Sequence, residues 1–294
     1  MPNALRLATR ASPQALAQSA TIADALSAAG AEVEIVTVVT TGDQRADVAL
    51  HTMGGQGVFV TEVQRAVLEG RADLAVHSAK DLPSATTEGL TIAAFGERRN
   101  PHDALVGCRL AELDDGATVA TGSVRRRAQL AEARPDLEFR ELRGNIARRL
   151  ERIPDGGAIV MAVAALQILG HLDRIAEELD PEVFIPAVGQ GAVAVECRVD
   201  DSVTAEFLAT VDHDPTRAAI EVERAFLAEL GSGCSLPVGA QVSGGVLRGF
   251  LADPEREVVA RRSSHLTGER VADLDRARDL ARALQADVTG QVGG

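Results

Sequence analysis

Short apolar segments rich in β-branched residues alternate with amphipathic helical segments through the first two thirds of this 294-residue chain. The pattern predicts strands over residues 4–9, 33–40, 73–77, 90–95, 118–121, 137–142 and 158–163. It predicts helices over residues 12–29, 59–68, 123–133, 145–152 and 164–176. Strands that alternate with helices are typical of parallel βαβ units, whose ligands bind beyond the carboxyl ends of the strands.

The last part of the chain has a different pattern. Helices are expected over 216–230 and 273–286, with short strands between them, which favours a small α+β domain. Residues 98–101 are predicted to be a hinge between two α/β units. The glycine-containing segment 187–198 is predicted to end in a strand that crosses back into the first unit. A long glycine-rich segment, 42–57, is a candidate lid because loops of that length are usually functional.

Charge excludes some partners and suggests another. The chain carries a net charge of −13, so nucleic acid and anionic membranes should repel it. The stretch from Arg98 to Arg152 departs from this, with twelve arginines against nine acids. Such a basic segment in an acidic protein suggests a local anionic ligand. Of the thirty basic residues only Lys80 is lysine, which singles out that ammonium group.

Cysteine usage and the amino terminus point to a cytoplasmic protein. The first residues carry arginines where a secretory signal would be apolar. Three widely spaced cysteines suit neither a disulfide framework nor a zinc site, so we expect reduced thiols and no metal. The longest uncharged stretch, residues 156–172, is short and polar for a membrane span, and no phosphate-binding loop motif is present.

Two strand-to-helix turns carry arginines. Ser123 is a good N-cap, but the three arginines that follow it oppose the helix dipole, at a cost of about 0.3–1 kcal/mol each when exposed. An anion should offset this cost. A similar turn occurs at Arg143-Gly-Asn145, and two such turns favour a ligand with several carboxylates. The alternative, a solvated basic face with surface ion pairs, is preferred for Arg127, Arg134, Arg148 and Arg152.

Two further places could carry chemistry. A strand ends in a polar turn that holds Ser78, Lys80 and Asp81, where an ionised carboxylate could stabilise a developing cation. An aspartate before Leu-Pro is also ordinary turn chemistry, so this signal is weak alone. Cys234 lies in Gly-Ser-Gly-Cys-Ser, where a little-covered thiol is a candidate for covalent attachment. Cys108 and Cys197 lie in apolar, strand-like contexts and are weaker candidates.

Six motifs together resemble the porphobilinogen deaminase family, also called hydroxymethylbilane synthases. They occur in order over nearly the whole chain: Ala8-Thr-Arg-Ala-Ser, Ala75-Val-His-Ser-Ala-Lys-Asp-Leu-Pro, Ser123-Val-Arg-Arg, Leu142-Arg-Gly-Asn, Pro186-Ala-Val-Gly-Gln-Gly-Ala and Gly233-Cys. Any one motif would be weak evidence, but six at family-like spacing are highly specific.

The resemblance implies a three-domain α/β fold. Two lobes like those of periplasmic binding proteins would flank a cleft, formed by residues 1–96 with 193–212 and by residues 97–192. Residues 213–294 would form the α+β C-terminal domain. The implied activity is that of a transferase, which condenses four porphobilinogen molecules on a dipyrromethane cofactor, loses ammonia each time and releases 1-hydroxymethylbilane for tetrapyrrole biosynthesis.

The resemblance also assigns roles. Cys234 would hold the cofactor by a thioether bond, and Asp81 would be the catalytic carboxylate that stabilises the azafulvenium cation left by ammonia. Each pyrrole carries an acetate and a propionate, which gives the arginines a purpose. The cofactor- and substrate-binding residues would be Arg10, Ser12, Phe59, Ser78, Lys80, Thr121, Ser123, Arg125, Arg126, Arg143, Asn145, Arg149 and Gln190. Phe59 would stack on a pyrrole ring.

The sequence departs from the family pattern at a few positions. Gly122 replaces a hydroxyl-bearing residue of many members, and the candidate lid has Thr41, Thr52 and Gln56 where some members carry basic residues. We therefore expect a weaker grip of the lid on carboxylates. Cys234 follows Gly-Ser-Gly where Gly-Gly or Ala-Gly is commoner.

The resulting hypothesis is a monomeric cytoplasmic enzyme that takes porphobilinogen and hands its product to uroporphyrinogen-III synthase, without nucleic-acid or membrane partners. Its rival is a non-catalytic binding protein for a small polycarboxylate in the same two-lobed cleft. Cys234 discriminates between them, because a reversible binder needs no covalently occupied thiol.

Overall fold

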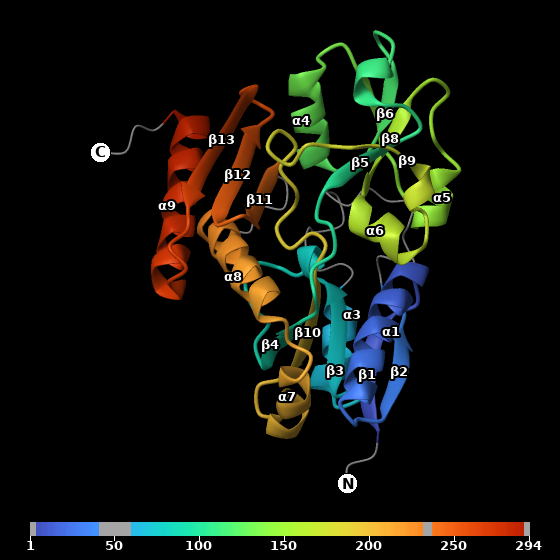
Figure 1. Cartoon of the computed structure of the whole chain (residues 1–294), viewed down its shortest axis with the longest axis vertical. Helices are drawn as coiled ribbons and strands as arrows, with labels where there is room; N and C mark the ends of the chain where they lie inside the picture. The colour runs from blue at the N-terminus through green and yellow to red at the C-terminus, as the bar shows by residue number, and fades with distance from the viewer. Residues whose placement is uncertain (1–3, 41–59, 232–236, 291–294) are drawn as a thin grey trace.

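The computed structural model describes residues 4–40, 60–231 and 237–290, which form two α/β lobes and a C-terminal α+β domain (Figure 1). The first lobe holds both the start of the chain and a later segment, Val193 to Val211. In the described parts of the chain, no helix is both long and apolar enough to cross a bilayer.

The first lobe is built on a five-stranded sheet with the order β2-β1-β3-β10-β4. Its strands are β1 (Leu5–Arg10), β2 (Val33–Val38), β3 (Leu74–Ser78), β4 (Leu90–Phe95) and β10 (Val193–Arg198). Strands β1, β2 and β3 are parallel, and β10 runs antiparallel to β3 and β4. The helices are α1 (Pro13–Ala28), α3 (Thr61–Leu68) and α7 (Ser202–Ala209).

Helices pack against both faces of this sheet through apolar residues. Ile22 and Leu26 of α1 pack against Leu7 and Leu74 on one face. Residues of α3 pack against Ala8 and Ala75 on the other face, in a separate cluster. The central strand β3 is buried over its first four residues, three of which are apolar, as expected for a strand covered on both faces, whereas the edge strand β2 is only partly buried.

The second lobe has a sheet of the same design, with the order β7-β6-β8-β5-β9. Its strands are β5 (Asp103–Val106), β6 (Thr118–Ala120), β7 (Glu138–Arg140), β8 (Ala158–Ala162) and β9 (Ile175–Glu178). Strands β6, β7 and β8 are parallel, and β5 runs antiparallel to β8 and β9. The helices are α4 (Val124–Ala133), α5 (Ile146–Leu150) and α6 (Val163–Ile168), with 3-10 turns η3 (Leu110–Glu112) and η4 (Leu172–Arg174).

Two crossing segments join the lobes, and each ends in the antiparallel strand of the lobe it enters. Residues 96–102 lead from β4 into β5, and residues 179–192 lead from β9 into β10. The two segments lie side by side, since Arg99 N donates to Gly191 O at 3.0 Å. The carboxyl ends of β3 and β8 meet where the lobes join, since Ser78 and Ala162 line one cavity. Strand β1 runs parallel to β3, and β6 and β7 run parallel to β8, so they end at the same edges.

The C-terminal domain packs two helices and a three-stranded antiparallel sheet around one core. The helices are α8 (Asp214–Glu229) and α9 (Arg270–Thr289), and the strands are β11 (Val238–Ser243), β12 (Val246–Asp253) and β13 (Val258–His265). Phe226, Leu247 and Leu284 lie at the centre of this core. In Figure 1, α8 lies between the strands of this domain and the first lobe.

Most of the predicted elements are confirmed, usually within two residues. The predicted crossing strand is β10, and the grouped strands near the end are β11 to β13. The prediction of one helix over 164–176 is wrong beyond Ile168, since η4 follows and β9 begins at Ile175. Among the α-helices and strands of the described residues, β5, β9 and α7 were not predicted. Strand β9 begins inside the stretch that was predicted as a helix, and β5 follows just after the predicted hinge, so neither was recognised as a separate strand.

Candidate functional site

The first lobe contributes two strand ends to the site. Arg10 ends β1, and Ser12 caps α1 by accepting a hydrogen bond from Ala15 N at 3.3 Å. A 3-10 turn, η2 (Ala79–Asp81), follows β3 and carries Lys80 and Asp81. Arg10, Ser12 and Asp81 share one cavity, which is lined by Arg10, Ser12, Gln14, Ala15, Gln18, Val60, Val76, His77, Ser78 and Asp81.

Ser78 lies between this cavity and a second one at the lobe junction. Its hydroxyl donates to Gln18 Oε1 at 3.0 Å, and both residues line both cavities. The second cavity also receives Lys80 and Arg99 from the first lobe and its crossing segment, and Ala165 of α6 from the second lobe. The cleft thus continues from Asp81 into the space between the lobes.

The second lobe contributes the two arginine-bearing turns. Thr121 follows β6, and its hydroxyl accepts from Ser123 N at 3.2 Å. Ser123 caps α4 by accepting from Arg126 N at 3.4 Å, as its sequence context predicted. This turn directs Arg125 and Arg126 into the protein, where they are 5% and 8% exposed.

The turn after β7 is held in a similar way. Asn145 caps α5 by accepting from Arg148 N at 3.0 Å, and Arg149 Nε donates to Gly144 O at 2.7 Å. Gly144 adopts φ +112°, a conformation that favours glycine. The turn is therefore closed by its own residues, with Arg149 folded back over it.

Three of the cations that the sequence assigned to the site have no carboxylate partner within ion-pair distance in the described residues. They are Lys80, Arg143 and Arg149, and the Nη1 atom of Arg143 is buried without a hydrogen-bond partner among those residues. Such a buried donor is costly unless a ligand satisfies it.

Burial and neighbouring charge lower the pKa of two of these cations. Burial, together with the charge of Arg126, lowers the pKa of Lys80 to about 8. Burial and the charges of Arg126 and Arg143 lower the pKa of Arg149 to about 10. The negative charge of Asp81 opposes both shifts, so Asp81 of the first lobe lies within electrostatic range of Arg149 of the second. An anionic ligand between the lobes would stabilise the charged forms.

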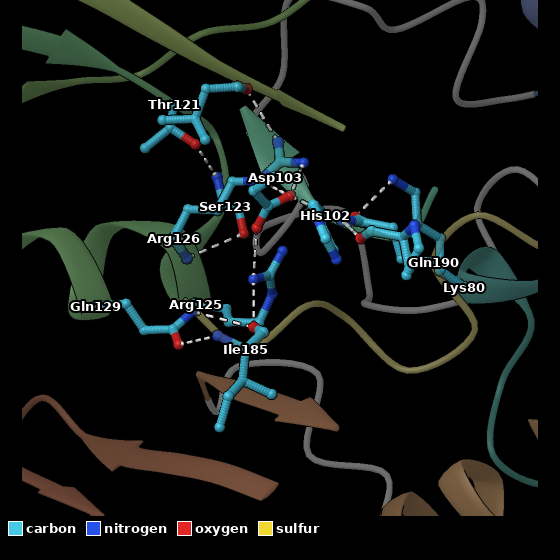
Figure 2. A network of polar contacts seen from close by, with 12 residues as sticks. Lys80, His102, Asp103, Thr121, Ser123, Arg125, Arg126, Gln129, Ile185 and Gln190 are labelled. Carbon is cyan, nitrogen blue, oxygen red and sulfur yellow. Dashed lines mark hydrogen bonds and ion pairs between the residues drawn. The ribbon is translucent and has the colours of Figure 1, made fainter. Parts of the chain in front are cut away.

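Asp103 is a site residue that the sequence analysis missed. It lies on β5, is 1% exposed, and its carboxylate contacts both Arg125 and Arg126 at 2.7 Å (Figure 2). Burial alone would raise the pKa of Asp103, but the charges of Arg125 and Arg126 outweigh it and hold the pKa far below the usual range. The anion expected to offset the arginines of α4 is thus in part an acid of the chain itself. The only signal in the sequence was an aspartate at the start of an apolar run.

Gln190 lies where the sequence predicted it, in the glycine-containing loop between the lobes. It is 1% exposed and donates to Asp103 Oδ1 at 2.8 Å and to Pro101 O at 2.7 Å. Its amide oxygen accepts from Lys80 Nζ at 3.3 Å (Figure 2). Lys80 and the arginine pair are therefore connected through Gln190 and Asp103.

Some predicted features lie outside the described residues: the attachment residue Cys234, the aromatic Phe59, and the candidate lid with Thr41, Thr52 and Gln56. The structure does account for Gly122. A Cβ atom there would lie 2.9 Å from Leu142 O and from Glu141 Oε1, so this turn has no room for a hydroxyl-bearing side chain without a shift.

Of the arginines assigned to a solvated face, Arg127, Arg148 and Arg152 are exposed. Arg134 is partly buried and pairs with Asp136 at 2.7 Å. The structure thus separates the arginines of this segment into an inward group at the cleft and an outward group.

These features define a two-lobed α/β protein with a basic cleft at its strand ends and a third domain beside the crossing segments. A model of the porphobilinogen deaminase dipyromethane cofactor binding domain matches residues 5–206, and a model of the porphobilinogen deaminase C-terminal domain matches residues 218–288. The porphobilinogen deaminase of Acidothermus cellulolyticus is 50% identical over 297 aligned positions, which cover 97% of this chain and 88% of that protein. The chain belongs to the porphobilinogen deaminase family, is an enzyme, and has dipyrromethane as its cofactor.

Two solved structures align with about three quarters of this chain at low similarity. The methionine binding protein MetQ aligns with a TM-score of 0.46 at 14% identity, covering 74% of this chain and 93% of that one. A periplasmic substrate-binding protein of a Coxiella burnetii ABC transporter aligns with a TM-score of 0.43 at 14% identity, covering 73% and 94%.

The cleft residues fit dipyrromethane, which carries four carboxylates on its two pyrrole rings. Lys80, Arg143 and Arg149 have no carboxylate partner in the described part of the chain, and Arg143 has a buried donor without a partner there. Arginine binds carboxylates through paired N–H groups, and lysine binds them as a point charge.

Proposed function

We propose that this chain is a transferase of tetrapyrrole biosynthesis that uses Asp81 as its catalytic carboxylate and Cys234 as the attachment point of dipyrromethane. The observation that carries the proposal is the position of Asp81 at a strand end, in one cavity with Arg10 and Ser12 and close to Lys80 and Arg149. When bound, dipyrromethane supplies a pyrrole carbon to which porphobilinogen units are added.

The role of Asp81 follows from the charge that the substrate develops. Loss of ammonia from porphobilinogen leaves a positive charge on its pyrrole ring, and a fixed carboxylate stabilises that charge and accepts a hydrogen bond from the pyrrole N–H. The surrounding cations serve a different purpose, because the acetate and propionate groups need positive partners. The residues proposed to bind cofactor and substrate are Arg10, Ser12, Phe59, Ser78, Lys80, Thr121, Ser123, Arg125, Arg126, Arg143, Asn145, Arg149 and Gln190.

We further propose the domain limits 1–96 with 193–212, 97–192, and 213–294. The position of β10 in the first sheet and the separate core around Phe226 support these limits. A monomeric state, a cytoplasmic location and transfer of the product to uroporphyrinogen-III synthase belong to the same proposal.

The attachment is tested by the intact mass of the purified full-length protein beside that of Cys234→Ser. An added mass equal to two porphobilinogen units less their ammonia is expected in the wild type and not in the variant. If the wild type has the bare polypeptide mass before and after incubation with porphobilinogen, the proposal is wrong and a reversible binding protein is favoured.

The role of Asp81 is tested by Asp81→Ala, compared with Asp136→Ala as a control. We expect Asp81→Ala to keep the cofactor mass but to lose at least about 100-fold in turnover, because it removes the fixed counter-charge of the cation. Asp136 pairs with Arg134 outside the cleft, so its loss should leave turnover unchanged. Turnover of Asp81→Ala close to that of the wild type would remove Asp81 from the mechanism.

A further inference from the structure

Asp103 holds both arginines of the α4 turn. Its Oδ2 atom accepts from Arg125 Nη1 at 2.7 Å, and its Oδ1 atom accepts from Arg126 Nη2 at 2.7 Å and Nε at 3.0 Å. Gln190 donates to the same Oδ1 at 2.8 Å. A carboxylate that accepts four hydrogen bonds in a buried site has one orientation, and it restricts its donors equally.

Each arginine is also fixed from a second side. Arg125 Nη1 donates to Ile185 O at 2.7 Å, and Arg126 Nη1 donates to Val160 O at 3.0 Å. These bonds within the described residues use two donor contacts of Arg125 and three of Arg126, whereas each guanidinium has five N–H groups. Both side chains therefore have a set position and retain N–H groups for a ligand.

Charge explains why an acid is placed here. Two buried guanidinium groups side by side repel each other, and burial lowers the pKa of Arg125. The ionised Asp103 cancels one of the two positive charges. The pair can thus stay buried and ordered before any ligand arrives, with one positive charge left to attract a carboxylate.

The same acid is connected to the other lobe. Asp103 contacts Gln190, and Gln190 accepts from Lys80, so the polar chain runs from α4 and β5 through the crossing segment to the turn after β3 (Figure 2). Gly189, beside Gln190, allows this approach, because a Cβ there would lie 3.1 Å from the backbone of Ala79 and Lys80.

We infer that Asp103 is a positioning residue of the reaction: it orders Arg125 and Arg126 for carboxylate binding and, through Gln190, fixes them relative to Lys80. This inference rests on the proposed function, in which these cations bind the carboxylates of cofactor and substrate. Asp103 is itself an anion and so does not bind the ligand's carboxylates directly: it acts through Arg125 and Arg126. Its effect is to remove the ordering cost from ligand binding, which is the usual benefit of a preorganised site.

The test compares Asp103→Asn with Asp273→Asn in the full-length chain. Asp273 is a matched control, since it is a 5% exposed carboxylate that accepts from Thr267 and Gly268 in the C-terminal domain, away from the cleft. We expect Asp103→Asn to raise the KM for porphobilinogen about tenfold per cofactor-loaded molecule and to lower the loaded fraction seen by intact mass. Asp273→Asn should lose stability but keep the wild-type KM and loaded fraction.

A second readout needs neither substrate nor turnover. Lys80 is the only lysine, so ¹³C reductive methylation labels it and the amino terminus alone, and Lys80→Arg assigns the two NMR signals. The charged groups around Lys80 are Asp81, Asp103, Arg125 and Arg126, with Arg99 in the same cavity. Asp103 raises the pKa of Lys80, so Asp103→Asn should lower that pKa by about half a unit or more, measured in Cys234→Ser chains to keep the cleft in one state.

The outcomes separate the inference from the proposed function. If the wild type loads and turns over while Asp103→Asn keeps its KM, its loaded fraction and the pKa of Lys80, the inference is wrong. If the wild type does neither, the proposed function fails and the titration still reports whether Asp103 acts on Lys80. Should Asp103→Asn not fold, Asp103→Glu keeps the charge but displaces the carboxylate: a raised KM with an unchanged Lys80 titration supports positioning, and a wild-type KM overturns it.

Discussion

At the scale of single residues, the cleft contains two kinds of arginine that the sequence does not distinguish. Arg125 and Arg126 are paired with Asp103, whereas Arg143 has a buried Nη1 atom with no partner in the described residues. A paired buried charge stabilises the fold through its partner. An unpaired buried charge destabilises the fold, because it has lost its contacts with water and gained no partner in return. The two kinds should therefore respond in opposite ways to removal.

We expect Arg143→Met to leave the free energy of unfolding unchanged, or to raise it by about 1 kcal/mol, because no hydrogen bond is lost from Nη1 and a desolvated donor is removed. The same change should reduce the cofactor-loaded fraction. Arg126→Met should instead lose about 3 kcal/mol, since Asp103 would keep only Arg125 and Gln190 as partners. Urea unfolding followed by circular dichroism measures both, as the chain has no Trp or Tyr. Equal losses in the two variants would contradict the distinction.

At the scale of elements, the crossing segments carry the geometry that the site needs. Their backbones meet at Gly191, which has φ +88° and where a Cβ atom would lie 2.4 Å from Arg99 O. Strand-to-helix turns, by contrast, are fixed locally by the caps Ser12, Ser123 and Asn145. The Ser123 cap was predicted from sequence because a cap acts within three residues of its helix start.

Gly191→Ala should therefore lower the free energy of unfolding by more than about 2 kcal/mol, because backbone strain adds to a clash with another backbone atom. Gly268→Ala is a suitable control: its φ is +84°, but a Cβ there has no neighbour within 4 Å. It should lose only about 1 kcal/mol. Urea midpoints of the two variants measure the difference, and similar values would show that the approach of the two segments is looser than the structure has it.

At the scale of the whole molecule, Glu223 of α8 joins the C-terminal domain to both crossing segments. It is fully buried and accepts from Arg98 Nη1 at 2.6 Å, from Gly189 N at 2.9 Å and from Val242 N at 2.8 Å. Arg98 Nε also donates to Gln190 O at 2.9 Å. One carboxylate thus connects the three parts of the fold where they meet. Its partner Gly189 directly precedes Gln190, a member of the polar chain in the cleft.

Glu223→Ala should cost about 3–5 kcal/mol of unfolding free energy, since it leaves Arg98 and two backbone N–H groups without their acceptor. The unfolding transition should also broaden as the domains lose their connection. Glu229 lies on the same helix as Glu223 and forms an exposed ion pair with Arg282 of α9. Glu229→Ala should therefore cost less than about 1 kcal/mol. A Glu223→Ala chain as stable as Glu229→Ala would mean that this junction does not hold the domains together.

The sequence by itself determined most strands and helices of the two lobes, but not β5, β9 and α7, together with the Ser123 cap and the strand-end turns that carry Asp81, Lys80 and the arginines. These features depend on neighbours within a few residues, so their patterns are visible along the chain. Only the tertiary structure decided which charges are already neutralised and which await a ligand. Asp103 contacts Arg125, 22 residues away in sequence, and Gln190, 87 residues away. Gln190 in turn contacts Lys80 of the other lobe. Such pairings have no periodicity: they arise when two antiparallel strands, each entering from the opposite lobe, bring distant segments into one buried site.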